Sequence, residues 1–319
     1  MSQSQSLVDV DVDVDDVDDA AEAALGRPLD TRTGDPGAGP GRRVDVRRVL
    51  RFVSRRPGLL LSVAVLVSVV LASFWPDLFT SRDPLAGVPS QNFRGPSADR
   101  WFGTDELGRD VFSRVVHGAQ LSLKATLIAV LVAFVVGGLL GVVAGFVGRW
   151  VDDVLMRFVD VLLSIPALFL SLALVTALGY GTVKVAVAVG IASVASFARV
   201  ARAEVLRVRQ AVFVEASRSC GARWYSVLGR HVLPNAAGPV IVLATLDFGS
   251  SILAVSALSF LGYGAPPPAP EWGTLISEGR NYLANAWWLT ALPGLAIAAT
   301  VLATNRIARA LDGEWSRQR

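Results

Sequence analysis

The sequence predicts an all-α polytopic membrane protein with six transmembrane helices and both termini in the cytoplasm. The composition and the distribution of apolar residues support this prediction. Apolar residues make up 52% of the 319 residues and charged residues 18%, and the mean hydropathy is +0.49. A soluble protein of this length would hold fewer apolar and more charged residues. The apolar residues also gather in long uncharged runs, as membrane-spanning helices require.

The first 40 residues differ in charge from the rest of the chain. They hold ten acidic residues and two arginines, whereas residues 41–319 hold 28 basic and 17 acidic residues. Seven carboxylates crowd between residues 9 and 19 and repel one another, and a glycine- and proline-rich stretch follows. We therefore expect residues 1–45 to be a disordered acidic tail and linker, with recruitment of a partner as the less favoured role. Residues 313–319 are expected to form a C-terminal tail.

Uncharged runs in residues 46–312 can be counted as spans, because roughly 20 apolar residues cross the hydrocarbon core as a helix. The runs are 57–76, 125–148, 161–183, 185–198, 239–262 and 281–305, the fifth interrupted by Asp247. The run 185–198 is short, and it reaches span length if Lys184 and Arg199 extend toward opposite surfaces. The alternative is a re-entrant segment there, which leaves five spans and puts the termini on opposite sides.

Arginine placement sets the orientation, since cytoplasmic loops accumulate positive residues. With the amino terminus inside, the inner segments hold seven arginines in 41–57, two in 149–157, seven in 198–235 and four in 306–319. The outer segments hold five in 75–120, together with six acidic residues, and one in 262–286. We therefore expect a cytoplasmic loop at about residues 199–235 and outer segments at about 77–120 and 262–286.

The cytoplasmic loop carries a spaced motif. Its residues are Glu215, Ala216, Ser217, Gly221, Leu233 and Pro234. Small side chains at Ala216 and Ser217 let another backbone approach, Gly221 permits a tight turn, and Pro234 suits the first turn of the next helix. The positive-inside bias accounts for the arginines of this loop, but it does not account for this spacing.

The motif resembles the Glu-Ala-Ala loop of ATP-binding-cassette importer permeases, with Ser217 in place of the second alanine. In that family the loop inserts a short helix into a cleft of the ATPase subunit. The resemblance implies that the six motif residues form the ATPase-coupling element. It also implies no catalytic residue and no cofactor in this chain, with ATP and Mg bound by partner ATPase subunits.

The outer sequence Gly103-Thr104-Asp105, followed by Gly108-Arg109-Asp110, resembles a segment of one branch of these permeases. That branch imports dipeptides, oligopeptides and, in some members, nickel. From the residue types alone, Thr104 or Asp105 can cap a helix. In the third run, Arg157 and Asp160 are three residues apart and are expected to pair, and Pro166 is expected to kink the helix.

The resemblance covers about residues 50–312 and implies a non-enzymatic permease subunit in the inner or plasma membrane of a prokaryote. Its expected cargo is a dipeptide or oligopeptide moved by alternating access, with nickel or another small solute as the alternative. The implied partners are a second homologous permease subunit, two ATPase subunits, an extracytoplasmic solute-binding protein and membrane lipid. Nucleic acid is not among them.

Asp247 lies well inside a span, where an ionised carboxylate facing lipid costs about 2.5–3.5 kcal/mol. We expect Asp247, with Ser250, to line the substrate path, or Asp247 to be satisfied by a nearby hydroxyl or backbone group. An ion-coupled secondary transporter is less favoured because it usually needs several such ionisable groups. One cysteine and two histidines predict no metal site, and neither lysine lies in a phosphate-binding loop.

Overall fold

The computed structural model describes residues 57–316, so the predicted tail at residues 1–45 and residues 317–319 lie outside the described part. Five helical segments of the described chain are long and apolar enough to cross a membrane. They are α3 (Pro57–Phe74), the run Val111–Val147, α8 (Thr182–Arg209), the run Trp224–Phe260 and α13 (Trp288–Ser316). A sixth span forms if the bent pair α6 (Arg149–Ser164) and α7 (Ala167–Leu178) is counted as one.

The pair α6 and α7 bends by 94° at Ile165 and Pro166. Proline disfavours helical backbone in the residue before it, and Ile165 is extended at φ −95° and ψ 127°. The sequence predicts a kinked helix over residues 161–183, and the structure instead has two helices at nearly a right angle. Pro166 removes a backbone donor and favours a break here, but Pro239 and Pro293 lie within continuous helices, so a proline alone does not determine the bend.

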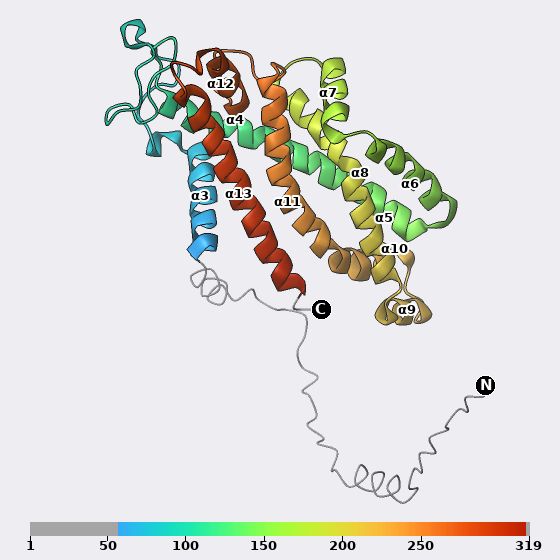
Figure 1. The fold of residues 1–319 in the computed structure, drawn as a ribbon. Coiled ribbons are helices and arrows are strands. Elements are labelled where there is room, and N and C mark those ends of the chain that lie inside the picture. Colours follow the sequence, from blue (N-terminus) through green and yellow to red (C-terminus); the bar gives the residue numbers. More distant parts are fainter. Residues whose placement is uncertain (1–56, 317–319) are drawn as a thin grey trace, which may run out of the picture. The chain divides into compact units, whose positions relative to one another are not determined.

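The short run 185–198 lies inside α8, a continuous helix of 28 residues. The re-entrant alternative is therefore wrong for this segment, because the helix continues through Lys184 and Arg199 instead of ending at these charges. α8 runs through the middle of the helical bundle and packs on α4 (Val111–Val132), α5 (Gly138–Val147), α7 and α11 (Leu233–Phe260) (Figure 1). A Cβ on Gly141 would lie 2.4 Å from the carbonyl oxygen of Ala198, so glycine permits this close contact between α5 and α8.

The second span begins earlier than its uncharged run indicates. α4 starts at Val111 and continues through the π-helical segment η3 (Ala133–Gly137) into α5. Asp110 caps α4 by accepting a hydrogen bond from the Ser113 backbone N–H at 2.9 Å, so the expectation that Thr104 or Asp105 caps a helix is wrong. Arg114 is buried and Lys124 is exposed, and α4 continues through both, so neither charge ends the helix.

The two ends of the described bundle differ in their elements. α3 and α13 run antiparallel, with Gly58 beside Arg306, so the first and last described residues lie at one end (Figure 1). α9 (Val212–Ser219) and α10 (Trp224–Val227) lie at this same end. α12 (Trp272–Gly279) lies at the opposite end, where the buried Trp272 indole donates to the Val115 carbonyl at 2.8 Å.

Candidate functional site

The predicted coupling motif forms a short helix and a turn. Glu215, Ala216 and Ser217 lie in α9, which ends where Gly221 adopts φ +81°. The Ala222 N–H donates to the Ser217 carbonyl across this turn at 3.1 Å. No heavy atom lies within 4 Å of a Cβ built on Gly221, so the backbone conformation rather than crowding favours glycine here.

One side of α9 attaches it to the bundle. Val214 is fully buried and packs with Val205 and Val208 near the end of α8 and with Val227 of α10. Glu215 and Ala216 are exposed. α9 is therefore fixed by an apolar contact on one side, and its other side is open to a partner.

Exposed apolar side chains surround the motif, and the motif spacing does not indicate them. Val212 is 81% exposed, Phe213 48% and Trp224 67%. Exposed arginines lie among them, at Arg218 and Arg223. We call the coupling surface the set Val212, Phe213, Glu215, Ala216, Arg218, Arg223 and Trp224. Such a mixture of aromatic and arginine side chains is typical of protein interfaces.

Leu233 and Pro234 lie at the start of α11 (Leu233–Phe260) rather than in a loop. α10 continues through the π-helical segment η4 (Leu228–Val232) directly into α11. Pro234 occupies the first turn of α11, as the sequence predicts, and both Leu233 and Pro234 are exposed. A displacement of α10 would therefore act on the same helix that carries Asp247.

Asp247 is half-buried between α11 and α8. The Ser193 hydroxyl of α8 donates to its Oδ1 at 3.2 Å, and the Ser251 hydroxyl donates to its Oδ2 at 3.1 Å. Ser250 is exposed on the adjoining surface of α11. The carboxylate thus has two hydroxyl partners, and part of its surface stays open.

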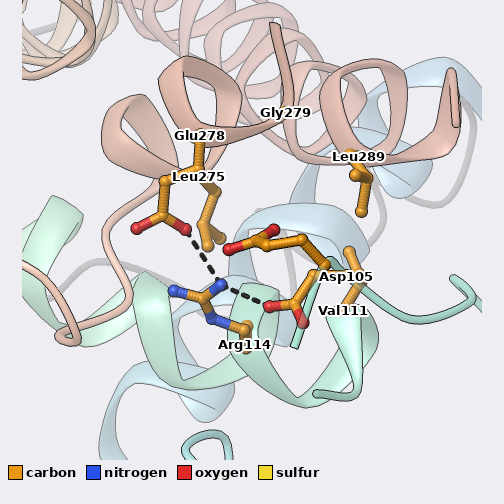
Figure 2. Close-up of a pocket in the computed structure, with 8 residues that line it drawn as sticks. Asp105, Val111, Arg114, Leu275, Glu278, Gly279 and Leu289 are labelled. Carbon is orange, nitrogen blue, oxygen red and sulfur yellow. Dashed lines mark hydrogen bonds and ion pairs between the residues drawn. The ribbon is translucent and has the colours of Figure 1, made fainter. Parts of the chain in front are cut away.

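A buried charged cluster joins α12 to the start of α4 (Figure 2). Arg114 is 1% exposed, and its Nη1 donates to Asp105 Oδ2 at 2.7 Å and to Glu278 Oε2 at 2.9 Å. Arg109 Nε also donates to Asp105, at 2.6 Å. The cavity beside these groups measures about 10 Å³, close to the smallest that holds one water. We call Asp105, Arg109, Arg114 and Glu278 the outer cluster, after the side of the membrane predicted for this segment. The cavity has no room for a larger ligand, so the cluster is expected to hold α12 against the start of α4.

A second group of charges lies beside it. Arg82 donates to Asp110 at 2.8 Å and to Asp99 at 2.7 Å, and Arg100 donates to Asp110 at 3.1 Å. The hydrogen bonds to Asp110 and Asp99 raise the pKa of Arg82 above its ordinary value. Asp110 therefore both caps α4 and holds the preceding segment against it.

The expected pairing of Arg157 with Asp160 is replaced by a pairing between helices. Asp160 of α6 forms an ion pair with Arg199 of α8 at 2.5 Å, and Asp152 binds Arg202 through both carboxylate oxygens. α6 lies along α8, so these carboxylates meet arginines of the neighbouring helix. The two ion pairs hold α6 against α8.

Within residues 57–310, whose side chains the structure describes, no group of three or more histidine, cysteine, aspartate or glutamate residues is arranged to hold a metal ion. Cys220 is exposed on the turn after α9. The described chemistry is thus that of ion pairs, hydroxyl-bound carboxylates and an exposed surface of aromatic and arginine side chains.

Comparison with known proteins gives consistent matches. Residues 137–317 match the family model described as "Binding-protein-dependent transport system inner membrane component". The chain is 37% identical over 261 residues to the dipeptide transport system permease protein DppC of Alkalihalophilus pseudofirmus, covering 82% of this chain and 86% of that protein. It is 40% identical over 263 residues to the probable D,D-dipeptide transport system permease protein DdpC of Escherichia coli, covering 82% and 88%.

Among solved structures, the chain resembles the crystal structure of an amino acid ABC transporter. The TM-score is 0.50 at 16% sequence identity, and the match covers 64% of this chain and 94% of the other. At this identity the likeness concerns the fold alone. It agrees with the helical bundle and with several membrane-spanning helices.

Proposed function

This chain belongs to the family of binding-protein-dependent transport system inner membrane components, and we propose that it translocates dipeptides or oligopeptides as a subunit of an ATP-driven importer. The similarity to named dipeptide permeases over most of the chain carries this proposal. The chain is a multi-pass membrane permease component and acts without covalent chemistry of its own. It works by alternating access, in which the passage changes the side of the membrane to which it opens.

The coupling surface is the proposed docking site for an ATPase subunit, which binds the ATP and Mg. Its exposed aromatic and basic side chains suit a protein partner. The buried Val214 packs α9 against the bundle, so a displacement of α9 by the ATPase would reach the neighbouring helices. Glu215, Ala216, Ser217 and Gly221 contact the ATPase in this proposal. Leu233 and Pro234 carry its movement into α11.

The proposed complex holds this chain, a second homologous permease subunit, two ATPase subunits and an extracytoplasmic solute-binding protein. Both termini lie in the cytoplasm, on the same side as α9, in the inner or plasma membrane of a prokaryote. The common location of α9 and of the first and last described residues at one end of the bundle supports this orientation (Figure 1). The arginines of residues 198–235 support it as well.

Reconstitution of the purified complex into liposomes tests the proposal. Radiolabelled dipeptide, delivered by the binding protein, is expected to accumulate only with ATP, and vanadate is expected to abolish accumulation. Mass spectrometry of the cargo captured by the binding protein identifies the substrate. Accumulation of nickel with no peptide uptake would contradict the peptide assignment, and peptide uptake driven by an ion gradient without ATP would contradict the importer class.

A further inference from the structure

The charge of Asp247 has no cationic partner within the described chain. Among the side chains of residues 57–310, the ion pairs involve other carboxylates, and the two groups that bind Asp247 are neutral hydroxyls. Asp152 and Asp160 differ in this respect, since each meets an arginine. Asp247 is therefore a carboxylate inside a span that the fold orients but does not neutralise.

The two hydroxyls fix the direction of the carboxylate. Ser193 binds one oxygen from α8 and Ser251 binds the other from one turn along α11, so the group cannot rotate without losing a bond. An ionised carboxylate offers about four acceptor positions, of which two are used here. The remaining positions are open to a group outside this chain, because the side chain is only half-buried.

Two exposed serines lie on the helices that hold Asp247. Ser250 is exposed on α11, and Ser196 is exposed one turn beyond Ser193 on α8. Polar groups inside membrane spans face the protein interior or a water-filled passage rather than lipid. This neighbourhood therefore suits the wall of a passage between helices.

Resting on the proposed function, we propose that Asp247 is a specificity-determining residue that binds the ammonium group of a peptide as it crosses the membrane. An ammonium group supplies three donors and a positive charge, matching the unused acceptor positions of one carboxylate with hydroxyl neighbours. A divalent metal ion suits the site less well. It requires more anionic or imidazole ligands than one carboxylate, and the described residues form no such group.

A ratio of uptake rates tests this assignment. Wild type and Asp247→Asn are reconstituted with the same partners, and uptake is measured for a peptide with a free amino terminus and for its N-acetylated form. Each peptide is used at a concentration that saturates the binding protein, and the fluorescence of the binding protein verifies the saturation. Both variants receive cargo from the same binding protein, so its preferences cancel in the ratio of the two rates.

The wild-type rate is expected to exceed the Asp247→Asn rate about tenfold for the free peptide and to equal it for the acetylated peptide, because only the first carries the ammonium group. Asp247→Glu keeps the charge, so its uptake rate for the free peptide is expected to be close to the wild-type rate. Thr245→Val is the matched control on α11, since the Thr245 hydroxyl donates only to the Ile241 carbonyl of its own helix.

Two results would overturn the assignment. If the ratio of the wild-type rate to the Asp247→Asn rate is the same for both peptides, the charge of Asp247 does not act on the substrate amine. Failure of Asp247→Asn to assemble, with normal assembly of Asp247→Glu, would show that the carboxylate pairs with a cation of a partner subunit. Absence of uptake of any peptide by the wild-type complex would instead contradict the proposed function, so the two failures are distinguishable.

Discussion

Two arginine-rich regions at opposite ends of the bundle use their charges differently. In the outer cluster, Arg109 and Arg114 are 5% and 1% exposed and bind carboxylates of the same chain. On the coupling surface, Arg218 and Arg223 are exposed beside apolar side chains such as Trp224. The outer arginines hold this chain together, whereas the coupling arginines are accessible to a second protein.

The balance of charges within each segment already distinguishes the two regions. Residues 75–120 hold five arginines and six acidic residues, and residues 198–235 hold seven arginines and two acidic residues. A segment with matched charges can satisfy them internally, while an excess of one sign must face solvent, lipid headgroups, a partner or another segment of the chain, as Arg199 and Arg202 face α6. The local balance is thus more informative than the number of arginines.

The largest effect is expected in the outer cluster. Arg114→Met leaves the buried Asp105 and the partly buried Glu278 with less positive charge near them, and removing one partner of a buried ion pair costs about 3–5 kcal/mol. Thermal unfolding of the purified subunit, followed by circular dichroism, measures the loss. Arg94→Met is the control, because Arg94 is exposed in the same outer segment and should change the free energy of unfolding by about 0.5 kcal/mol or less. Equal stability of the two variants would contradict a structural role for the cluster.

Gly221→Trp is expected to affect the coupling surface through transport rather than stability. A bulky side chain beside α9 obstructs the ATPase, and obstruction at an interface hot spot lowers uptake by more than about tenfold. ATP-driven uptake and ATP hydrolysis are measured together, with hydrolysis expected to continue without transport. Gly221→Ala separates backbone strain at φ +81° from obstruction, and it should retain most uptake. Full uptake by well-expressed Gly221→Trp would contradict the docking role.

Sequence reasoning located the spans where apolar residues alone determine them. The runs at 57–76 and 239–262 correspond to α3 and α11. It underestimated α8, because Lys184 and Arg199 lie on the helix although they end the uncharged run. It also predicted only a kink at Pro166, since the angle depends on how α6 and α7 pack. Charge placement marks where a membrane surface can lie, but helix ends depend on caps and packing.

The candidate site was predictable only in part, for a related reason. The turn at Gly221 follows from a local property, the tolerance of glycine for positive φ. The exposure of Phe213 and Trp224 depends on which side of α9 and α10 faces the bundle. The pairing of Arg114 with Glu278 joins residues 164 positions apart, which no local pattern indicates. Local conformation could be predicted, whereas exposure and long-range pairing required the fold.

Removing the exposed ion pair between α6 and α8 is expected to have a smaller effect than the substitutions in the outer cluster or on the coupling surface. The Asp160 and Arg199 side chains are 59% and 57% exposed, so Asp160→Asn is expected to cost at most about 1 kcal/mol. Asp152→Asn is the comparison, because Asp152 is 13% exposed and binds Arg202 through both oxygens. Asp152→Asn is expected to lose more free energy of unfolding than Asp160→Asn in the same thermal unfolding measurement. The reverse order would show that burial does not determine the strength of these ion pairs.

The smallest effect is expected from deleting residues 2–40, which lie outside the described residues. Their ten carboxylates are a chemical match for the arginines of the coupling surface, so the deletion tests whether those arginines serve another part of this chain. We expect assembly and uptake to change by less than about twofold, because such charge density prevents the segment from burying a core of its own. Co-purification of the ATPase and the uptake rate are measured for the truncated and full-length chains. A lost complex would identify the tail as a docking segment, and faster ATP hydrolysis after truncation would show that it competes with the ATPase for the coupling surface.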